Sequence, residues 1–342
     1  MPKIVHLVPY DGIGGVEAAA RSMGSLTHEN ISFDVAYIYQ NLNAGRPSTS
    51  MFSPWPLVTA AWRIRNVPPD VLIVSLWRSA IVGLIAKVLR PRIKLVTFLH
   101  NSTNVHFPDF VLTRLSVLFS TAVWADSQAT LSGRVPDMQS KKCHVISFVT
   151  RRFDPLPLCP AIPSFIFWGR ITQQKGLDRA IHLFANIQNR YPHSRFWVIG
   201  PDGGALQATQ ALCLSLGLED SVTFLGSATH DEIVGYARNA SFYLQTSHFE
   251  GMAMSVVEAM QLGLVPVVTP VGEIANYCLD GVNAVVVLSD QQAQADVIDL
   301  LDASARFKSM RADAIATWAN QPLYRDSVLS ACQDVLAAQS AT

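Results

Sequence analysis

The chain has 342 residues, of which 49% are hydrophobic and 15% are charged. This balance excludes an intrinsically disordered chain, and the length favours two domains of ordinary size. Lysine and arginine total 26, and aspartate and glutamate total 26, so the formal net charge is zero. Nucleic-acid binders usually show a basic excess. Because this chain has none, we expect any anion-binding site to be local.

The first half of the chain alternates short apolar runs with longer helical patterns. The apolar runs are continuous, which predicts a parallel sheet covered on both faces. The expected strands span residues 4–8, 33–39, 71–76, 94–99, 122–125 and 144–147.

Residues 153–164, FDPLPLCPAIPS, interrupt this alternation with four prolines. Proline neither donates to a β-ladder nor continues a helix interior, so the segment predicts a linker. The alternation then restarts, with expected strands at 165–169, 195–200, 222–226, 241–245, 265–269 and 284–288 and a helical apolar stripe at 177, 181, 184 and 187. The sequence therefore predicts an α/β fold with two Rossmann-like halves facing each other across a cleft, which is the expected binding site.

Five cysteines lie far apart, without a C-x-x-C pair or a zinc-binding cluster, and are expected to be free thiols in a reducing compartment (Cys143, Cys159, Cys213, Cys278 and Cys332). The first residues, MPKIVHLVPYDGIGG, lack the basic region and long apolar core of a signal peptide. Charges and a proline interrupt the apolar segment 80–96 before it reaches membrane-spanning length. We expect a cytoplasmic protein.

Glycines follow the first expected strand in DGIGGVE, residues 11–17. Gly14 and Gly15 allow backbone amides to approach an anion at a helix N-terminus. The spacing is not the dinucleotide fingerprint, because Glu17 stands where its third glycine is required. A plain tight turn explains the glycines equally well.

Two cations follow the first strand of the second half, in WGRITQQKGLD, residues 168–178. The forked guanidinium of Arg170 and the mobile ammonium of Lys175 suit a diphosphate. Two solvated surface charges are the alternative interpretation.

Two carboxylates flank an apolar run in HFEGMAMSVVEAM, residues 248–260. A helix is expected to begin near residues 251–254, and eight helical residues rise about 12 Å. Glu250 and Glu258 are therefore suited to two parts of one elongated ligand, a sugar ring and a ribose diol. The alternative is an acidic helix start and an exposed helix residue. Together with the glycines and the cations, these carboxylates predict a site for a nucleotide diphosphate joined to a sugar.

With these motifs the chain resembles the retaining GT-B glycosyltransferases of family 4, the glycosyl transferases group 1. The likeness covers nearly the whole chain and is strongest over residues 165–287. The most specific motif is E-x7-E. The motifs that match are Glu250 with Glu258, GR followed by KG (Arg170, Lys175 and Gly176), GGVE (14–17), FLHNS (98–102, with His100) and VTFLG (222–226), which borders the nucleobase in the family.

The resemblance implies a domain order. Residues 1–155 form an N-terminal acceptor domain, 156–164 a linker and 165–320 a nucleotide-sugar domain. Residues 321–342 form a helix that packs back towards the N-terminal domain.

The resemblance also implies roles for single residues. Glu250 and His100 are implied as catalytic, and Glu258 binds the ribose. The donor diphosphate contacts Arg170, Lys175, Gly14, Gly15 and Ser255, and the donor sugar contacts the backbone of Gly251, Met252, Ala253 and Met254. The family's G-G-x-x-E loop is altered here to GEIANY at Gly272 and Glu273.

No Asp-x-Asp motif occurs in the chain, so we expect no metal ion and no cofactor, with the cations and helix amides stabilising the diphosphate. The implied partners are a UDP- or GDP-linked sugar and a saccharide or lipid-linked acceptor, in bacterial envelope polysaccharide or lipopolysaccharide synthesis. A GT-B sugar-nucleotide epimerase and a non-catalytic nucleotide-sugar-binding module are the alternatives.

Basic residues in WRIR (62–65) and KVLRPRIK (87–94) are interleaved with apolar ones. They indicate either contact with an anionic membrane surface or ordinary basic helix ends, and the second is the simpler interpretation. Nucleic acid is not an expected partner.

Overall fold

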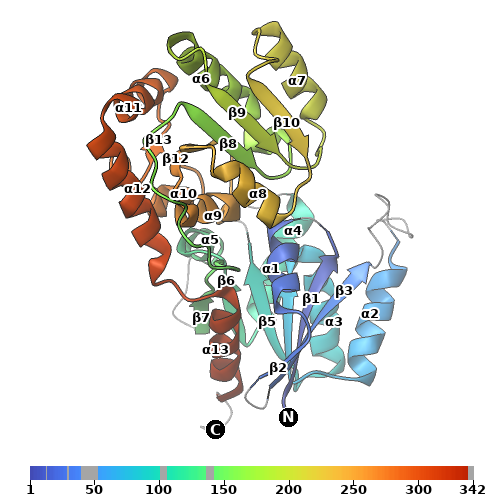
Figure 1. The fold of residues 1–342 in the computed structure, drawn as a ribbon. Helices are drawn as coiled ribbons and strands as arrows, with labels where there is room; N and C mark the ends of the chain where they lie inside the picture. The colour runs from blue at the N-terminus through green and yellow to red at the C-terminus, as the bar shows by residue number, and fades with distance from the viewer. Residues whose placement is uncertain (13, 29–30, 40–52, 101–105, 136–141, 338–342) are drawn as a thin grey trace. The chain divides into compact units, whose positions relative to one another are not determined.

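A computed structural model describes the chain except for residues 13, 29–30, 40–52, 101–105, 136–141 and 338–342. The chain divides into two units (Figure 1), with residues 1–151 and 322–342 in unit 1 and residues 152–321 in unit 2. Each unit is built around its own sheet, so the expected α/β class with two parallel sheets is confirmed.

The sheet of unit 1 has seven strands in the order β2-β3-β1-β4-β5-β6-β7. All neighbours pair in parallel except β2 and β3. The six expected strands are confirmed, whereas β2 was not predicted because its three residues are too few to show a pattern. The bounds are β1 Lys3–Tyr10, β2 Leu26–His28, β3 Ile31–Tyr39, β4 Val71–Ser75, β5 Lys94–Leu99, β6 Ala122–Ala125 and β7 Lys142–Val145.

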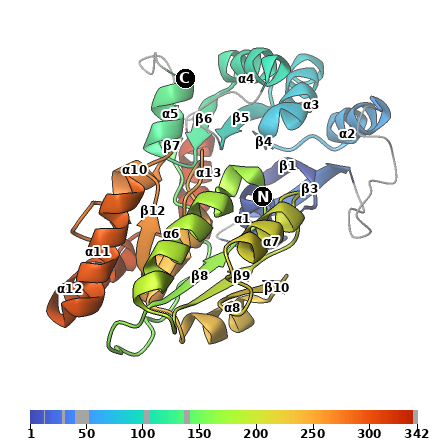
Figure 2. The same cartoon turned by 90° about the horizontal axis from the view of Figure 1, so that it is seen from above.

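Helices cover both faces of this sheet, as the continuous apolar strands require. Figure 2 shows α2, α3 and α4 in a row on one face and α1 and α13 on the other. The bounds are α1 Gly15–Met23, α2 Trp55–Asn66, α3 Leu76–Leu89, α4 Phe107–Phe119, α5 Gln128–Arg134 and α13 Tyr324–Ala337.

The last helix, α13, belongs to unit 1 through specific contacts. The backbone amide of Tyr324 donates to the carbonyl of Val149 at 2.8 Å. The buried ammonium of Lys94 donates to the carbonyls of Val335 and Leu336, both at 2.9 Å. A cation at this position also meets the negative end of the helix dipole.

The sheet of unit 2 has six parallel strands in the order β10-β9-β8-β11-β12-β13. Each overlaps one of the six strands expected for the second half. The bounds are β8 Ser164–Trp168, β9 Arg195–Ile199, β10 Val222–Gly226, β11 Phe242–Gln245, β12 Val265–Val268 and β13 Val285–Val286.

The expected stripe of the first helix of unit 2 is buried at Leu177, Ile181, Phe184 and Ile187. Its helices are α6 Leu177–Arg190, α7 Leu206–Ser215, α8 His230–Ala237, α9 Met254–Leu262, α10 Ile274–Tyr277, α11 Asp290–Asp302 and α12 Ser304–Ala319, with a 3₁₀ turn at Gln173–Lys175.

The proline-rich segment forms no helix or strand before β8 and is held against unit 2 by single hydrogen bonds. The amide of Leu156 donates to the carbonyl of Leu262 at 3.0 Å, and the amide of Ile162 donates to Ser241 Oγ at 2.9 Å.

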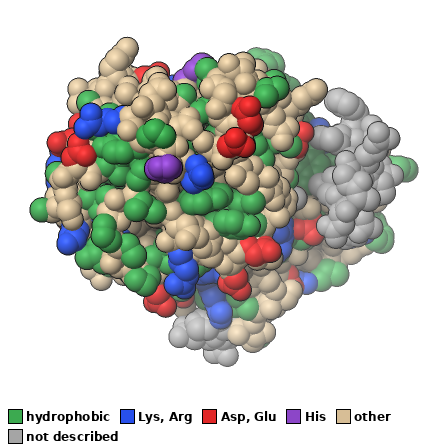
Figure 3. All heavy atoms as spheres, turned by 45° about the horizontal axis from the view of Figure 1, so that its top comes forward, with side chains coloured by type: hydrophobic (Ala, Val, Ile, Leu, Met, Phe, Trp, Pro, Cys, Tyr) green, Lys and Arg blue, Asp and Glu red, His purple; other side chains and the backbone are tan. Residues whose placement is uncertain are grey.

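Figure 3 shows acidic and basic side chains interspersed over the face that it presents, without a large patch of one sign. Among the helices that the structure describes, none combines the length and hydropathy needed to cross a membrane.

Candidate functional site

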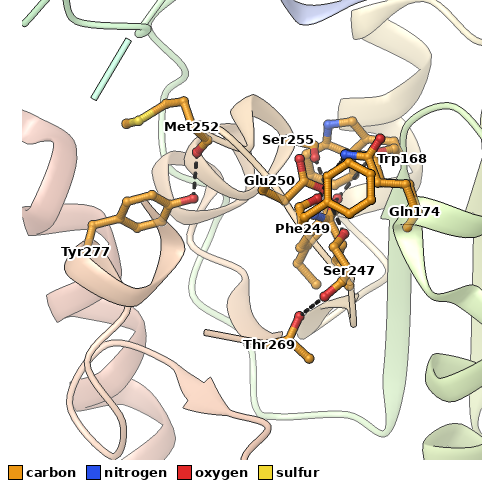
Figure 4. Close-up of polar contacts among 12 residues, drawn as sticks. Trp168, Gln174, Ser247, Phe249, Glu250, Met252, Ser255, Thr269 and Tyr277 are labelled. Carbon is orange, nitrogen blue, oxygen red and sulfur yellow. Dashed lines mark hydrogen bonds and ion pairs between the residues drawn. The ribbon is translucent and has the colours of Figure 1, made fainter. Parts of the chain in front are cut away.

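The carboxylate of Glu250 lies at the centre of a polar cluster that follows β11 in unit 2 (Figure 4). Its Oε1 accepts hydrogen bonds from Lys175 Nζ at 2.7 Å, Ser247 Oγ at 2.7 Å and Gln245 Nε2 at 3.1 Å. Within the described residues its Oε2 accepts none. Three donors on one oxygen fix the orientation of the carboxylate and leave the second oxygen for a ligand.

Lys175 reaches Glu250 because two loops are joined, the one after β8 and the one after β11. Thr246 Oγ1 donates to the carbonyl of Gly176 at 2.6 Å, and Gln174 Nε2 donates to the carbonyl of Phe249 at 2.9 Å. Gly176 has a φ of 61°, and a Cβ there would overlap the carbonyl oxygen of Thr246. Only glycine meets both requirements.

Arg170 is placed differently from Lys175. Its side chain is exposed, and its aliphatic part lies against Gly203, where a Cβ would meet Arg170 Cγ at 2.8 Å. Within the described part of the chain the guanidinium makes no ion pair. The two expected diphosphate ligands therefore differ: Lys175 is held by Glu250, and Arg170 is open to solvent.

Glu258 on α9 is not the exposed helix residue of the alternative interpretation, because 14% of its side chain is accessible. Trp168 Nε1 donates to its Oε2 at 2.8 Å, and His230 Nε2 lies 3.7 Å from its Oε1. No sequence pattern pointed to Trp168 or His230, which lie 90 and 28 residues away from Glu258 along the chain.

The loop between the two carboxylates is held through its backbone. Tyr277 Oη donates to the carbonyl of Met252 at 2.9 Å (Figure 4), and the amide of Glu273 donates to the carbonyl of Gly251 at 3.0 Å. Gly272 is left-handed, and a Cβ there would overlap the carbonyl of Glu250. The GEIANY loop thus supports this loop although it departs from the family pattern.

Ala253 precedes α9 with a φ of 56°, an uncommon value for a residue other than glycine. It directs the chain into α9, whose first amides have no partner within the helix. Next along the helix, Ser255 Oγ donates to Gln245 Oε1 at 3.1 Å, and Tyr243 Oη donates to the same oxygen at 2.7 Å.

This pair of bonds fixes the amide of Gln245, whose nitrogen then donates to Glu250. Burial raises the pKa of Tyr243 well above its usual value, so the hydroxyl stays a donor. The sequence signal for Gln245 is a polar residue at the end of an apolar strand, and it was not among the predicted site residues.

The glycine loop lies on unit 1, where Gly14 precedes α1 in an extended conformation and Gly15 is its first residue. The carboxylate of Glu17 folds back to this helix start, because a Cβ at Gly14 would overlap Glu17 Oε2. An acidic group there is favoured by the helix dipole.

His100 follows β5 on unit 1 and is buried. Its Nε2 lies 2.8 Å from Ser75 Oγ, and His6 Nε2 lies 2.7 Å from the same oxygen. Burial lowers the pKa of His6 to about 3. Burial, together with His6, lowers the pKa of His100 well below its usual value. Asn101 and Ser102 of the FLHNS motif lie outside the described residues.

His100 also lines a cavity of about 320 Å³ at the carboxyl ends of β1, β4 and β5. The Arg78 guanidinium carbon lies 4.8 Å from the centre of the Trp77 ring. Asp109 and Arg134 form an ion pair at 3.4 Å. The wall therefore combines aromatic faces with charges of both signs.

In the described part of the chain no group of three or more His, Cys, Asp or Glu side chains is arranged to hold a metal ion. All five cysteines are free thiols. The absence of a metal requirement stays a prediction.

Replacing Gly176 by alanine tests the junction of the two loops. Gly217 has a similar φ of 67° with nothing within 4 Å of a Cβ, so Gly217→Ala measures backbone strain alone. We expect Gly217→Ala to lower the free energy of unfolding by about 1 kcal/mol, and Gly176→Ala by about 3 kcal/mol or more. Urea unfolding measures both, and equal losses would contradict the packing described for Gly176.

The two buried histidines predict a pH dependence of stability. Their pKa values are lower in the folded than in the unfolded protein, so the unfolded state binds more protons below about pH 6.5. The free energy of unfolding should therefore fall on acidification from about pH 6.5, by up to about 1.4 kcal/mol per pH unit for each histidine.

Urea unfolding of His6→Gln between pH 5 and 7 measures this effect. The variant should show a smaller slope than the wild type. An unchanged slope in His6→Gln would show that folding does not lower the pKa of His6.

Comparison with known proteins gives a family match for the second half of the chain. Residues 162–316, somewhat under half of the chain, match the family described as Glycosyl transferases group 1. The chain is 26% identical over 157 residues to the GDP-mannose:cellobiosyl-diphosphopolyprenol alpha-mannosyltransferase of Xanthomonas campestris. This alignment covers 45% of this chain and 41% of that protein. The first curated relatives are covered over 30–41% of their length.

Solved structures match over the whole chain. HepE from Anabaena, in complex with UDP and glucose, has a TM-score of 0.76 at 18% identity, and sucrose-phosphate synthase from Thermosynechococcus elongatus has 0.75 at 13%; both alignments cover 100% of each chain. The expected fold is confirmed: the chain has the GT-B fold, and its residues 162–316 are similar to the glycosyl transferases group 1.

Proposed function

We propose that the chain is a retaining glycosyltransferase of family 4 that moves a sugar from a nucleotide-diphosphate sugar to a saccharide or lipid-linked acceptor. The observation that carries this proposal is the bond between Lys175 and Glu250, together with Glu258 oriented by Trp168, within the segment that matches the glycosyl transferases group 1. The family description favours transfer over a sugar-nucleotide epimerase or a non-catalytic binding module.

Unit 2 supplies the groups that a nucleotide-diphosphate donor requires. The ammonium of Lys175 has three N–H donors, and its bond to Glu250 uses one. The other two, with Arg170 and the first amides of α9 before Ser255, are proposed to bind the diphosphate. The backbone of residues 251–254 would follow the donor sugar.

The two carboxylates have separate roles in this proposal. Glu250 Oε2 would stabilise the positive charge that develops on the sugar as the diphosphate leaves. Glu258, oriented by Trp168, would accept the hydroxyls of the ribose. Each role uses a carboxylate that neighbouring residues have already oriented.

The mechanism that we propose is an attack by the acceptor on the same face as the departing diphosphate, without a protein nucleophile. Protein cations and helix amides neutralise the leaving group, so no metal ion or cofactor is required. A side chain that is fixed before the reaction does not need to reorganise as charge develops.

On unit 1 we propose His100, Gly14 and Gly15 as further contacts of the donor or acceptor, and the cavity lined by His100 and Trp77 as the place of the acceptor. Aromatic faces beside charged side chains suit a saccharide. The low pKa of His100 makes it a neutral hydrogen-bonding group rather than a cation.

The substrates follow from the relatives by analogy. The Xanthomonas campestris relative is named for GDP-mannose and a cellobiosyl-diphosphopolyprenol acceptor, and HepE was solved with UDP and glucose. Both UDP- and GDP-sugars are therefore candidate donors. We propose a role in envelope polysaccharide or lipopolysaccharide synthesis in the cytoplasm, with peripheral membrane contact.

The basic segments that suggested membrane contact mainly serve helix ends. Arg63 and Arg65 lie in the last turn of α2. Lys87 donates to the carbonyls of Pro91 at 2.9 Å and Ile93 at 2.8 Å, and Arg90 donates to the carbonyl of Arg65 at 3.1 Å. These contacts fit the simpler interpretation, so membrane contact requires other support.

Calorimetric titration with UDP and GDP tests the donor site. We expect Lys175→Met and Arg170→Met each to lose about tenfold or more in affinity, because each removes a charged donor to the diphosphate. The exposed Lys308→Met is the matched control and should bind as the wild type does. Wild-type affinity in both site variants would place the diphosphate elsewhere.

The same titration in EDTA and in Mg²⁺ tests metal independence, and binding only with Mg²⁺ would contradict it. Product analysis separates the remaining functions. A new glycoside with the donor's anomeric configuration supports the proposal, whereas an interconverted nucleotide sugar supports the epimerase.

A further inference from the structure

Helix α4 of unit 1 has its polar and apolar sides reversed. Three polar residues, Asp109, Thr113 and Ser116, are buried against the unit. The large apolar side chains point outward, with Phe107, Leu118 and Phe119 exposed by 76%, 62% and 55%. A surface helix of a globular protein normally has the opposite arrangement.

The buried polar side of α4 is fully engaged, so the reversal is a stable arrangement. Thr113 Oγ1 donates to Asp109 at 3.0 Å, and Asp109 pairs with Arg134. Ser116 Oγ lies 2.6 Å from Thr97 Oγ1 on β5. Rotating the helix to bury its apolar side would break these contacts, and buried polar groups without partners are costly.

The two neighbouring helices extend the apolar surface. On α2, Trp55, Val58 and Trp62 are exposed, and their spacing of three and four residues places them on one face of the helix. On α3, Val88 is 80% exposed. Helix α3 contacts both α2 and α4, and the three form one row (Figure 2).

Exposed large apolar side chains are concentrated on helices α2, α3 and α4. Of 22 large apolar side chains exposed in the described residues, 11 belong to α2, α3 and α4, and exposed apolar groups that are contiguous mark interaction sites. We call these 11 side chains the α2–α4 face: Trp55, Val58, Trp62, Ile85, Val88, Leu89, Phe107, Phe110, Leu115, Leu118 and Phe119.

The charges of the three helices are of one sign where they are exposed. Their exposed basic residues are Arg63, Arg65 and Arg114, whereas Arg78 and Lys87 are half-buried, and their single acidic residue, Asp109, is buried. Aromatic and aliphatic side chains with arginines around them suit the headgroup region of an anionic bilayer. A second copy of the chain would instead bring like charges together.

We propose that the α2–α4 face binds the surface of an anionic lipid bilayer, with its apolar side chains inserted among the headgroups. The role of this bilayer contact rests on the proposed function, because it would bring the enzyme to a lipid-linked acceptor. Residues of α4 also line the cavity beside His100, through Asp109 and Thr113. One helix would then contact both the bilayer and a lipid-linked acceptor drawn from it.

Sedimentation with phosphatidylcholine vesicles, with and without phosphatidylglycerol, tests the surface. We expect the full chain to sediment with the anionic vesicles and to be released by salt. Leu118→Ser combined with Phe119→Ser should lower the partition coefficient about tenfold or more, because two inserted apolar groups are lost. Arg114→Gln should weaken binding to anionic vesicles alone.

The matched control is Leu214→Ser combined with Leu288→Ser in unit 2, where the side chains are 67% and 71% exposed. It should bind vesicles as the wild type does. Calorimetry with UDP and GDP shows that each variant keeps its donor site, and it separates failure of the surface from failure of the proposed function.

Two results would overturn the proposal. One is a wild-type chain that stays in the supernatant with anionic vesicles, or that binds no better than the Leu118→Ser, Phe119→Ser variant. The other is a wild-type dimer, seen by light scattering, that this variant dissociates, since the face would then join two copies of the chain.

Discussion

The bond between the ammonium of Lys175 and the carboxylate of Glu250, 2.7 Å long, is the contact on which the proposed donor site of unit 2 depends. It joins two loops that are 75 residues apart in sequence and orders both. The contact is possible because Gly176 lets the two backbones meet, and because Gln245 and Ser247 share the same carboxylate oxygen. A partly buried ion pair persists when further hydrogen bonds satisfy its members.

Backbone strain occurs at the same structural position in unit 1 and in unit 2. Two described residues other than glycine have a positive φ, and both lie where a strand passes into a helix: Leu76 at 66° before α3 and Ala253 at 56° before α9. Each costs about 1–2 kcal/mol and persists only where the surroundings hold it. Leu76 follows Ser75, which joins His6 to His100, and Ala253 follows Glu250 in the loop held by Tyr277.

The sequence predicted the features that depend on local residue patterns, namely the strands and the motifs at their ends. Apolar runs gave the strands of both sheets, and the glycine, cation and carboxylate motifs were found at strand ends. Trp168, His230 and Gln245 were missed, because their importance comes from contacts between distant segments. The outward apolar side of α4 was also hidden, since a hydrophobic pattern predicts burial and only the structure shows that Asp109, Thr113 and Ser116 are buried instead.

A double-mutant cycle of Lys175→Met and Glu250→Gln, measured by urea unfolding of the full chain, tests the central contact most directly. If the two side chains bond as described, the losses in unfolding free energy will be non-additive, with a coupling of about 1–3 kcal/mol. Additive losses, with a coupling near zero, would show that the ammonium and the carboxylate do not meet in the folded chain.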